Sequence, residues 1–216
     1  DNYLSILGDL AKLQKEWNKS IDFYVKAYQI NPQNFKVLES AMQVCLSVEL
    51  FKKAEQICKM LVDYNVNDSN YWLTYKQITA YNKNYHNTLN AINELERIEG
   101  ESIKLTLEKS AIIQELNNIK QAIKILLKAH EPDSANVEIV KRLVSLYLED
   151  QNFEDAEIFN MLLLREFSDD SAGYINAAII SLNNDSPSAA IKYLEPVITR
   201  FNDNYSALYL LGTSYF

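Results

Sequence analysis

The sequence of 216 residues is poor in cysteine, histidine, glycine and proline. Two cysteines, Cys45 and Cys58, are too few for a disulfide framework, and no Cys/His cluster has zinc-ligand spacing. Neither His86 nor His130 has a Ser, Cys or acidic partner at a recognisable motif spacing. Four scattered glycines cannot form a phosphate-binding loop, and the scattered carboxylates suggest no catalytic pair. We therefore expect no enzymatic activity, no metal and no cofactor.

The sequence also lacks an excess of positive charge and any long apolar run. The formal net charge is −8 and the isoelectric point is about 4.9, which does not suit a partner with a phosphate backbone. No apolar run approaches the roughly 20 residues that span a bilayer. We expect neither nucleic-acid binding nor membrane insertion. The two cysteines, expected as buried free thiols, favour a cytoplasmic location, and a periplasmic one stays open.

What the sequence does contain is a pattern that recurs every 34 residues without gaps. Each row predicts two amphipathic helices, because apolar residues three and four apart form a stripe on one helix face. We number the columns by position in the row, so that column 20 is the twentieth residue. Column 20 is always small: Ser20, Ala54, Thr88, Ala122, Ala156 and Ala190. A small residue lets two helix backbones approach closely.

The rows predict a single α-solenoid over residues 1–216. Its repeats are 1–34, 35–68, 69–102, 103–136, 137–170 and 171–204, followed by the first helix of a seventh at 205–216. The loops between helices and between repeats are rich in Asn, Asp and Ser, which we expect to cap the following helices. Gly100 is expected to end a helix and Ser102 to cap the next. Pro196 lies well inside a predicted helix and predicts a kink just before it.

The columns resemble the tetratricopeptide repeat over the whole chain. In that pattern a large residue is followed by Leu-Gly, a large residue and aromatic-x-x-Ala, with a proline closing the repeat. In the first row these places hold Leu4, Leu7-Gly8, Trp17, Ser20, Tyr24, Ala27 and Pro32. The resemblance implies an all-α, right-handed superhelix whose concave groove is lined by the first helix of each repeat. The fourth row departs most, with Thr106, Lys109 and Ser110 in its first helix. We expect looser stacking on the third row or a bend of the groove there.

The resemblance places the groove at columns 2, 5, 9 and 12 of the first helices. The groove is predicted to be polar in the first two rows and increasingly apolar afterwards. The candidate partner-binding residues are Leu73, Gln77, Leu107, Lys141, Leu148, Ile175, Ile179, Leu182 and Tyr209. Chaperone-tail binding by a carboxylate clamp is not expected. Its nearest match is Lys141 with Asn176, and the seventh row has Ser206 and Leu210 where Lys and Arg would be needed.

These observations predict a non-enzymatic scaffold that holds a partner protein or peptide in its groove. The alternatives are a recognition or regulatory arm of a larger multidomain enzyme and a sensor of small molecules or peptides. The seventh row has no second helix, so we expect Leu208, Leu211 and Tyr215 to be uncovered. We also expect that the parent chain continues or that this end meets another chain. A missing helix could equally cover the apolar part of the groove.

Overall fold

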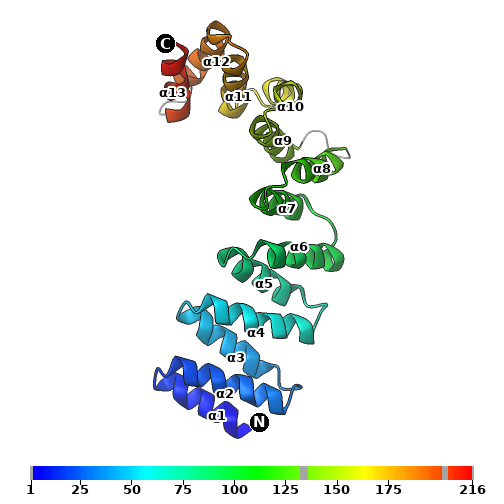
Figure 1. The fold of residues 1–216 in the computed structure, drawn as a ribbon, viewed down its shortest axis with the longest axis vertical. Coiled ribbons are helices and arrows are strands. Elements are labelled where there is room, and N and C mark those ends of the chain that lie inside the picture. The colour runs from blue at the N-terminus through cyan, green and yellow to red at the C-terminus, as the bar shows by residue number, and fades with distance from the viewer. Residues whose placement is uncertain (1, 132–135, 201–203, 216) are drawn as a thin grey trace. The chain divides into compact units, whose positions relative to one another are not determined.

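The computed structural model describes residues 2–131, 136–200 and 204–215, which form thirteen helices and no strand (Figure 1). Each of the first six 34-residue rows holds two helices and the seventh holds one, which confirms the all-α repeat prediction. The bounds are α1 Asn2–Leu13, α2 Trp17–Ile30, α3 Lys36–Ser47, α4 Phe51–Tyr64, α5 Ser69–Tyr81, α6 Tyr85–Glu99, α7 Ile103–Glu115, α8 Ile119–His130, α9 Val137–Glu149, α10 Phe153–Glu166, α11 Ser171–Asn183, α12 Pro187–Arg200 and α13 Tyr205–Ser214.

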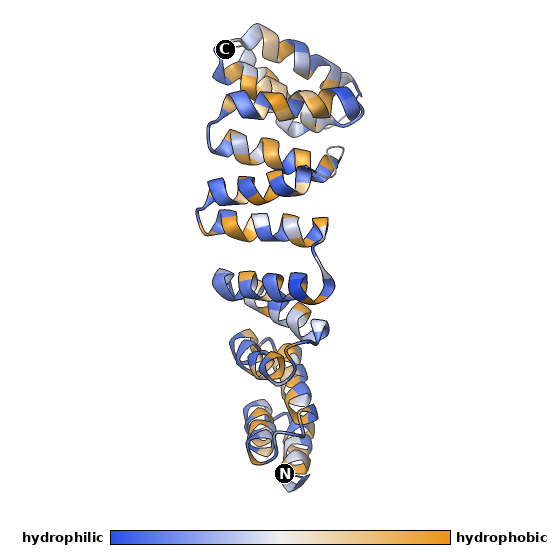
Figure 2. Cartoon of the chain, turned by 90° about the vertical axis from the view of Figure 1, so that its right-hand side faces the viewer, coloured by the Kyte–Doolittle hydropathy of each residue, from blue (hydrophilic) through white to orange (hydrophobic). Residues whose placement is uncertain are grey.

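The chain forms two compact units, Asp1–Leu105 and Thr106–Phe216. In the first unit each helix from α1 to α6 packs on its neighbours along the chain, and in the second unit α8 to α13 do the same. Each unit is thus built as an α-solenoid of helix pairs. Every helix carries both hydrophobic and hydrophilic residues, as amphipathic packing requires (Figure 2). A single continuous solenoid over all seven rows stays a prediction.

The turn between the two helices of a repeat has the same backbone conformation six times. The residue in column 15 is left-handed, with φ between 52° and 61°, in Lys15, Glu49, Lys83, Asn117, Gln151 and Asp185. The next N–H then reaches the carbonyl five residues back, as in Glu16 N to Ala11 O at 2.8 Å and Leu50 N to Cys45 O at 2.8 Å. This is a Schellman-type helix end, which usually has glycine at the left-handed position. Here no row has one.

Asparagine and aspartate cap most of the helices that follow the loops. Their side chains accept a hydrogen bond from a first-turn N–H at Asp68, Asn84, Asn118, Asn136, Asn152, Asp170 and Asn204. Gly100 ends α6 at φ 91°, and the Oγ of Ser102 accepts from the N–H of Leu105 at 3.2 Å, as predicted. The capping prediction is wrong for α2 and α3. These helices begin after Glu16 and Phe35, which make no side-chain cap bond.

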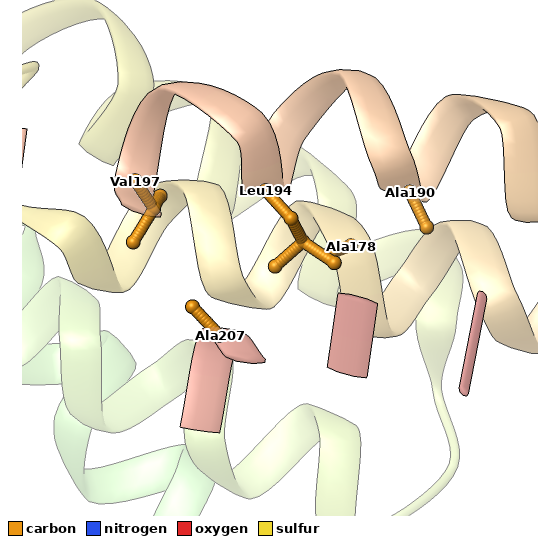
Figure 3. Packing of buried hydrophobic residues seen from close by; sticks show 5 residues of the cluster. All are labelled: Ala178, Ala190, Leu194, Val197 and Ala207. Carbon is orange, nitrogen blue, oxygen red and sulfur yellow. The ribbon is translucent and has the colours of Figure 1, made fainter. Parts of the chain in front are cut away.

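The small residues of column 20 are the most deeply buried positions of the repeats. All six have a relative exposure of 1% or less. In the first repeat the Oγ of Ser20 donates to the carbonyl of Gly8 at 2.8 Å, so the two helix backbones nearly touch. In the sixth repeat Ala190 of α12 belongs to the same buried cluster as Ala178 of α11 (Figure 3). The predicted reason for the small column is therefore confirmed.

Two polar residues of the fourth row, Ser110 and Gln114, are held by a hydrogen-bonded network. Ser110 is fully buried, and its Oγ donates to the carbonyl of Leu107 at 2.7 Å and accepts from Arg142 Nε at 3.3 Å. Arg142 also donates to the Oε1 of Gln114 at 2.5 Å, and Gln114 donates to Glu149. The network links α7 to α9. It gives hydrogen-bond partners to polar groups, such as the Ser110 hydroxyl, that lie where most other repeats have apolar or small side chains.

Two further predictions concern Pro196 and the cysteines. Helix α12 runs from Pro187 to Arg200 with Pro196 inside it, and the predicted kink stays a prediction. Cys45 and Cys58 are buried free thiols, as expected. Burial raises the pKa of the Cys45 thiol to about 11 and that of Cys58 to about 12. Both therefore remain protonated and unreactive near neutral pH.

The glycines of column 8 give a test of close helix approach. A Cβ on Gly8 would lie 2.6 Å from the ring of Tyr24, whereas a Cβ on Gly212 would meet nothing within 4 Å. We expect Gly8→Ala to lower the free energy of unfolding by about 2 kcal/mol through overpacking. Gly212→Ala should raise it by up to about 1 kcal/mol, because alanine favours the helix. Urea unfolding of both variants checks this; an equal effect of the two would contradict it.

The left-handed turns give a second test. A non-glycine residue at positive φ is strained by roughly 1–2 kcal/mol, and asparagine is strained less than most residues. We expect Glu49→Gly to raise the free energy of unfolding by about 1 kcal/mol and Asn117→Gly to raise it less. Thermal and urea unfolding measure both. A loss of stability in Glu49→Gly would show that this conformation is not the native one.

Candidate binding face on the first helices

The first unit presents a mainly polar surface at the groove columns. On α5, Leu73 is 41% exposed and Gln77 is exposed. On α1 and α3 the same columns hold two carboxylates that accept hydrogen bonds from tyrosines, Tyr24 to Asp9 at 2.7 Å and Tyr71 to Glu39 at 2.6 Å. Burial and the Asp9 carboxylate raise the pKa of Tyr24 to about 12. Leu73 is thus the exposed apolar residue among these groove positions.

The second unit presents apolar side chains at some of the same columns of α7, α11 and α13, whereas α9 has Glu138, Lys141 and Ser145 at columns 2, 5 and 9. Leu107 of α7 and Ile179 of α11 are half-buried, and Tyr209 of α13 is 73% exposed. Helix α11 packs directly against α9 and α13, so these three first helices lie side by side. We call the residues at columns 2, 5, 9 and 12 of α7, α9, α11 and α13 the second unit's first-helix face.

Three of the predicted groove residues also serve the core. Ile175 and Leu182 pack against the cluster formed by Ala178, Ala190, Leu194, Val197 and Ala207, which Figure 3 shows between α11, α12 and α13. Leu148 packs against a second cluster formed by Val140, Val144 and Leu163. All three are half-buried. These three members of the first-helix face therefore also contribute to the core, whereas Tyr209 is largely exposed to solvent.

Lys141 is engaged within the protein. Its Nζ forms an ion pair with the carboxylate of Asp170 and lies 3.9 Å from Glu138 Oε1. The hydrogen bond from Lys141 holds the pKa of Asp170 below its ordinary value, against a smaller opposing effect of burial. The pair borders a cavity of about 540 Å³ beside the α10–α11 loop, with Val137 and Phe167 among its lining residues. Lys141, which the sequence offered as the nearest match to a carboxylate clamp, thus has its charge paired with Asp170.

A polar cavity on the second-helix side of the first unit was missed by the sequence reasoning. It has a volume of about 580 Å³ and contains Glu55 of α4. Three side-chain amides donate to the Glu55 carboxylate, from Asn82 at 2.7 Å, Asn84 at 2.7 Å and Asn87 at 3.1 Å. These bonds tie the third repeat to the second. The one signal for this cavity in the sequence is the close spacing of the three asparagines.

The two end helices expose apolar side chains. At the C-terminal end Leu208 is 47% and Tyr215 66% exposed, as predicted, whereas Leu211 is half-buried against the sixth-repeat core, contrary to prediction. At the N-terminal end, α1 exposes a stripe that the sequence reasoning did not single out: Tyr3 at 72%, Ile6 at 57%, Leu10 at 49% and Leu13 at 80%.

Within the described part of the chain, no group of three His, Cys, Asp or Glu side chains could hold a metal ion. His130 packs edge to face with the Phe159 ring at 5.5 Å between centroids, and its buried Nδ1 finds no hydrogen-bond partner among the residues that the structure describes. Among the same residues, no helix is both long and apolar enough to cross a membrane.

The fold was compared with known proteins. No family model and no curated protein matches the sequence. Among solved structures, YrrB, a TPR protein with an unusual peptide-binding site, matches 86% of this chain and 96% of its own at 14% identity, with a TM-score of 0.61. The chain has the tetratricopeptide-repeat fold. A repeat protein from Parabacteroides merdae matches 99% of this chain and 83% of its own at 14% identity (TM-score 0.56). PilW, a type IV pilus biogenesis factor, matches 97% of both chains at 11% identity (TM-score 0.60).

The ion pair between Lys141 and Asp170 predicts a pH-dependent contribution to stability. Because the pKa of Asp170 is lowered by folding, the contribution is present above the ordinary aspartate pKa and is lost as the pH falls through the lowered value. Asp170→Asn keeps a capping side chain on α11 but removes the charge. We expect it to cost less than about 1 kcal/mol at pH 7, since both side chains are about one-third exposed.

Urea unfolding at several pH values measures this difference. The free energies of wild type and Asp170→Asn should converge between pH 5 and pH 2. A difference that stays constant over this range would show that the ion pair is not formed in solution.

Proposed function

We propose that this protein is a non-enzymatic scaffold that binds a partner protein or peptide on the first-helix face of its second unit. The observation that carries the proposal is the set of half-exposed and exposed apolar side chains at the groove columns of α7, α11 and α13, led by Leu107, Ile179 and Tyr209. Apolar side chains at regular positions across adjacent helices suit an extended or helical peptide with several apolar anchors. The structural neighbour YrrB, described as having a peptide-binding site, supports this use of the fold.

The charge of the second unit indicates which partners are favoured. Residues 106–216 carry 16 acidic and nine basic side chains, so this unit holds most of the net negative charge. Glu138 on the face is largely exposed, and Lys141 beside it is paired with Asp170. A partner with apolar anchors and basic flanking residues would therefore be attracted and an acidic one repelled. Chaperone-type acidic tails are the least suitable partners.

A pair of triple variants tests the face. Leu107→Asp, Ile179→Asp and Tyr209→Asp together place three charges on the first-helix face. The control Ile158→Asp, Met161→Asp and Tyr193→Asp places the same charges on exposed positions of the second helices α10 and α12. Because buried anchors carry most of the binding energy at an interface, we expect the first triple variant to lose at least about tenfold in partner capture and the control to keep it.

The measurement is affinity capture from an extract of the native cells with quantitative mass spectrometry. Circular dichroism confirms that both variants remain folded. Equal capture by wild type and by the first-helix variant would contradict the proposed face. Loss of partner capture in the control variant alone would indicate that the partner binds to the second helices instead.

A further inference from the structure

Glu55 occupies a helix position that most of the other repeats keep apolar. Column 21 is apolar in four of the six rows, which hold Ile21, Leu89, Ile123 and Ile191. None of these four side chains is exposed. In the second repeat the same column brings a half-buried carboxylate to the wall of the cavity of about 580 Å³ on the second-helix side of the first unit. Partial burial of a charge is unfavourable unless its partners compensate for the lost water.

The partners of Glu55 are neutral and leave its charge unpaired. Asn84 and Asn87 donate to its Oε1 at 2.7 and 3.1 Å, and Asn82 donates to its Oε2 at 2.7 Å. Among the residues that the structure describes, no lysine or arginine forms an ion pair with it. A carboxylate can accept about four hydrogen bonds, so about one acceptor site is left. Oε2, which has one amide donor where Oε1 has two, keeps that site for a cationic ligand.

An unpaired cation lies on the same wall of the cavity. Lys52 precedes Glu55 by three residues on α4, so the two side chains share one face of the helix, about 4.5 Å apart along its axis. Lys52 is exposed and forms no ion pair within the described part of the chain. Lys59, which also lines the cavity, is already paired with Asp63. The cavity thus presents one carboxylate and one ammonium group, both unpaired, within reach of a single small molecule.

The fifth repeat has a glutamate in the same column without this arrangement. Glu157 is exposed, and no asparagine donates to it among the described residues. Columns 14, 16 and 19 of the third row supply the three amides to Glu55, whereas in the sixth row they hold Asn184, Ser186 and Ala189. The carboxylate fixed by three amides is therefore particular to the contact between the second and third repeats. Glu157 provides a matched control for Glu55.

We propose that this cavity is a binding site for a free α-amino acid. The ammonium group of the ligand donates to Glu55 Oε2, and its carboxylate pairs with Lys52. The two neighbouring charges of an α-amino acid match a carboxylate and an ammonium group that lie one helical turn apart. A cavity of about 580 Å³ is of the size of small-molecule sites and leaves room for the side chain of the ligand. The site lies in the first unit, separate from the first-helix face of the second unit.

Titration calorimetry of the full chain with each of the standard L-amino acids tests the proposal. We expect saturable binding of at least one of them. For that amino acid, the N-acetyl derivative lacks the ammonium group and the amide derivative lacks the carboxylate. Each derivative should bind at least about tenfold more weakly than the free amino acid, because each leaves one charged group of the site without its partner.

Three variants test the residues of the site. Glu55→Gln removes the charge at nearly constant size and should weaken binding of the same amino acid at least about tenfold. Lys52→Met should also weaken it, and this variant should stay folded because Lys52 is exposed. The matched control Glu157→Gln makes the same change in the same column and should bind as wild type does. Circular dichroism checks the folding of all three variants.

Three results would overturn the proposal. The first is the absence of saturable binding by any of the amino acids. The second is equal binding by wild type and Glu55→Gln, which would place the ligand elsewhere. The third is equal binding of the free amino acid and its amide derivative, which would reduce the site to one for a simple ammonium group. Failure of partner capture on the second unit would change none of these results, so the two proposals fail independently.

Discussion

The close approach of two helix backbones at column 20 is the contact on which the rest of the structure depends. Ser20, Ala54 and their four equivalents are nearly inaccessible, and no larger side chain would fit without separating the helices. Because the two helices of a repeat are in close contact there, only part of each apolar stripe is buried between them. The rest of the stripe faces the neighbouring repeat. Each pair can then bury its stripe only against the next pair, which is what makes the chain a repeat protein.

The left-handed residue in column 15 is a second constraint that repeats without variation. It turns the chain back after the first helix in six repeats, although lysine, glutamate and glutamine, which occupy four of the six positions, are poor residues for that conformation. Since glycine would relieve the strain, the turn geometry is imposed by the packing of the two helices and not by local preference. At this position the tertiary packing overrides the backbone preference of the local sequence.

Much of the architecture could be predicted from the sequence because a 34-residue period places equivalent residues in equivalent surroundings. The helix pairs, the small column, the Gly100 terminus and the exposed Leu208 all follow from that period. Side-chain pairing between repeats could not be predicted in this way. Examples are the hydrogen bond between Ser110 and Arg142 and the ion pair between Lys141 and Asp170. Such pairs depend on the relative positions of neighbouring segments, which are determined by contacts between residues distant in sequence. For the same reason Ile175 and Leu182, predicted as groove residues, turn out to support the core as well.

Under the proposed function, the partner contacts the first helices of the second unit and not its second helices. A photo-crosslinking amino acid at single positions of the second unit tests this most directly, using the partner found by affinity capture. A probe at position 179 on α11 should crosslink to the partner, and a probe at position 158 on α10 should not. Crosslinking at position 158 and none at position 179 would contradict the assignment of the binding face.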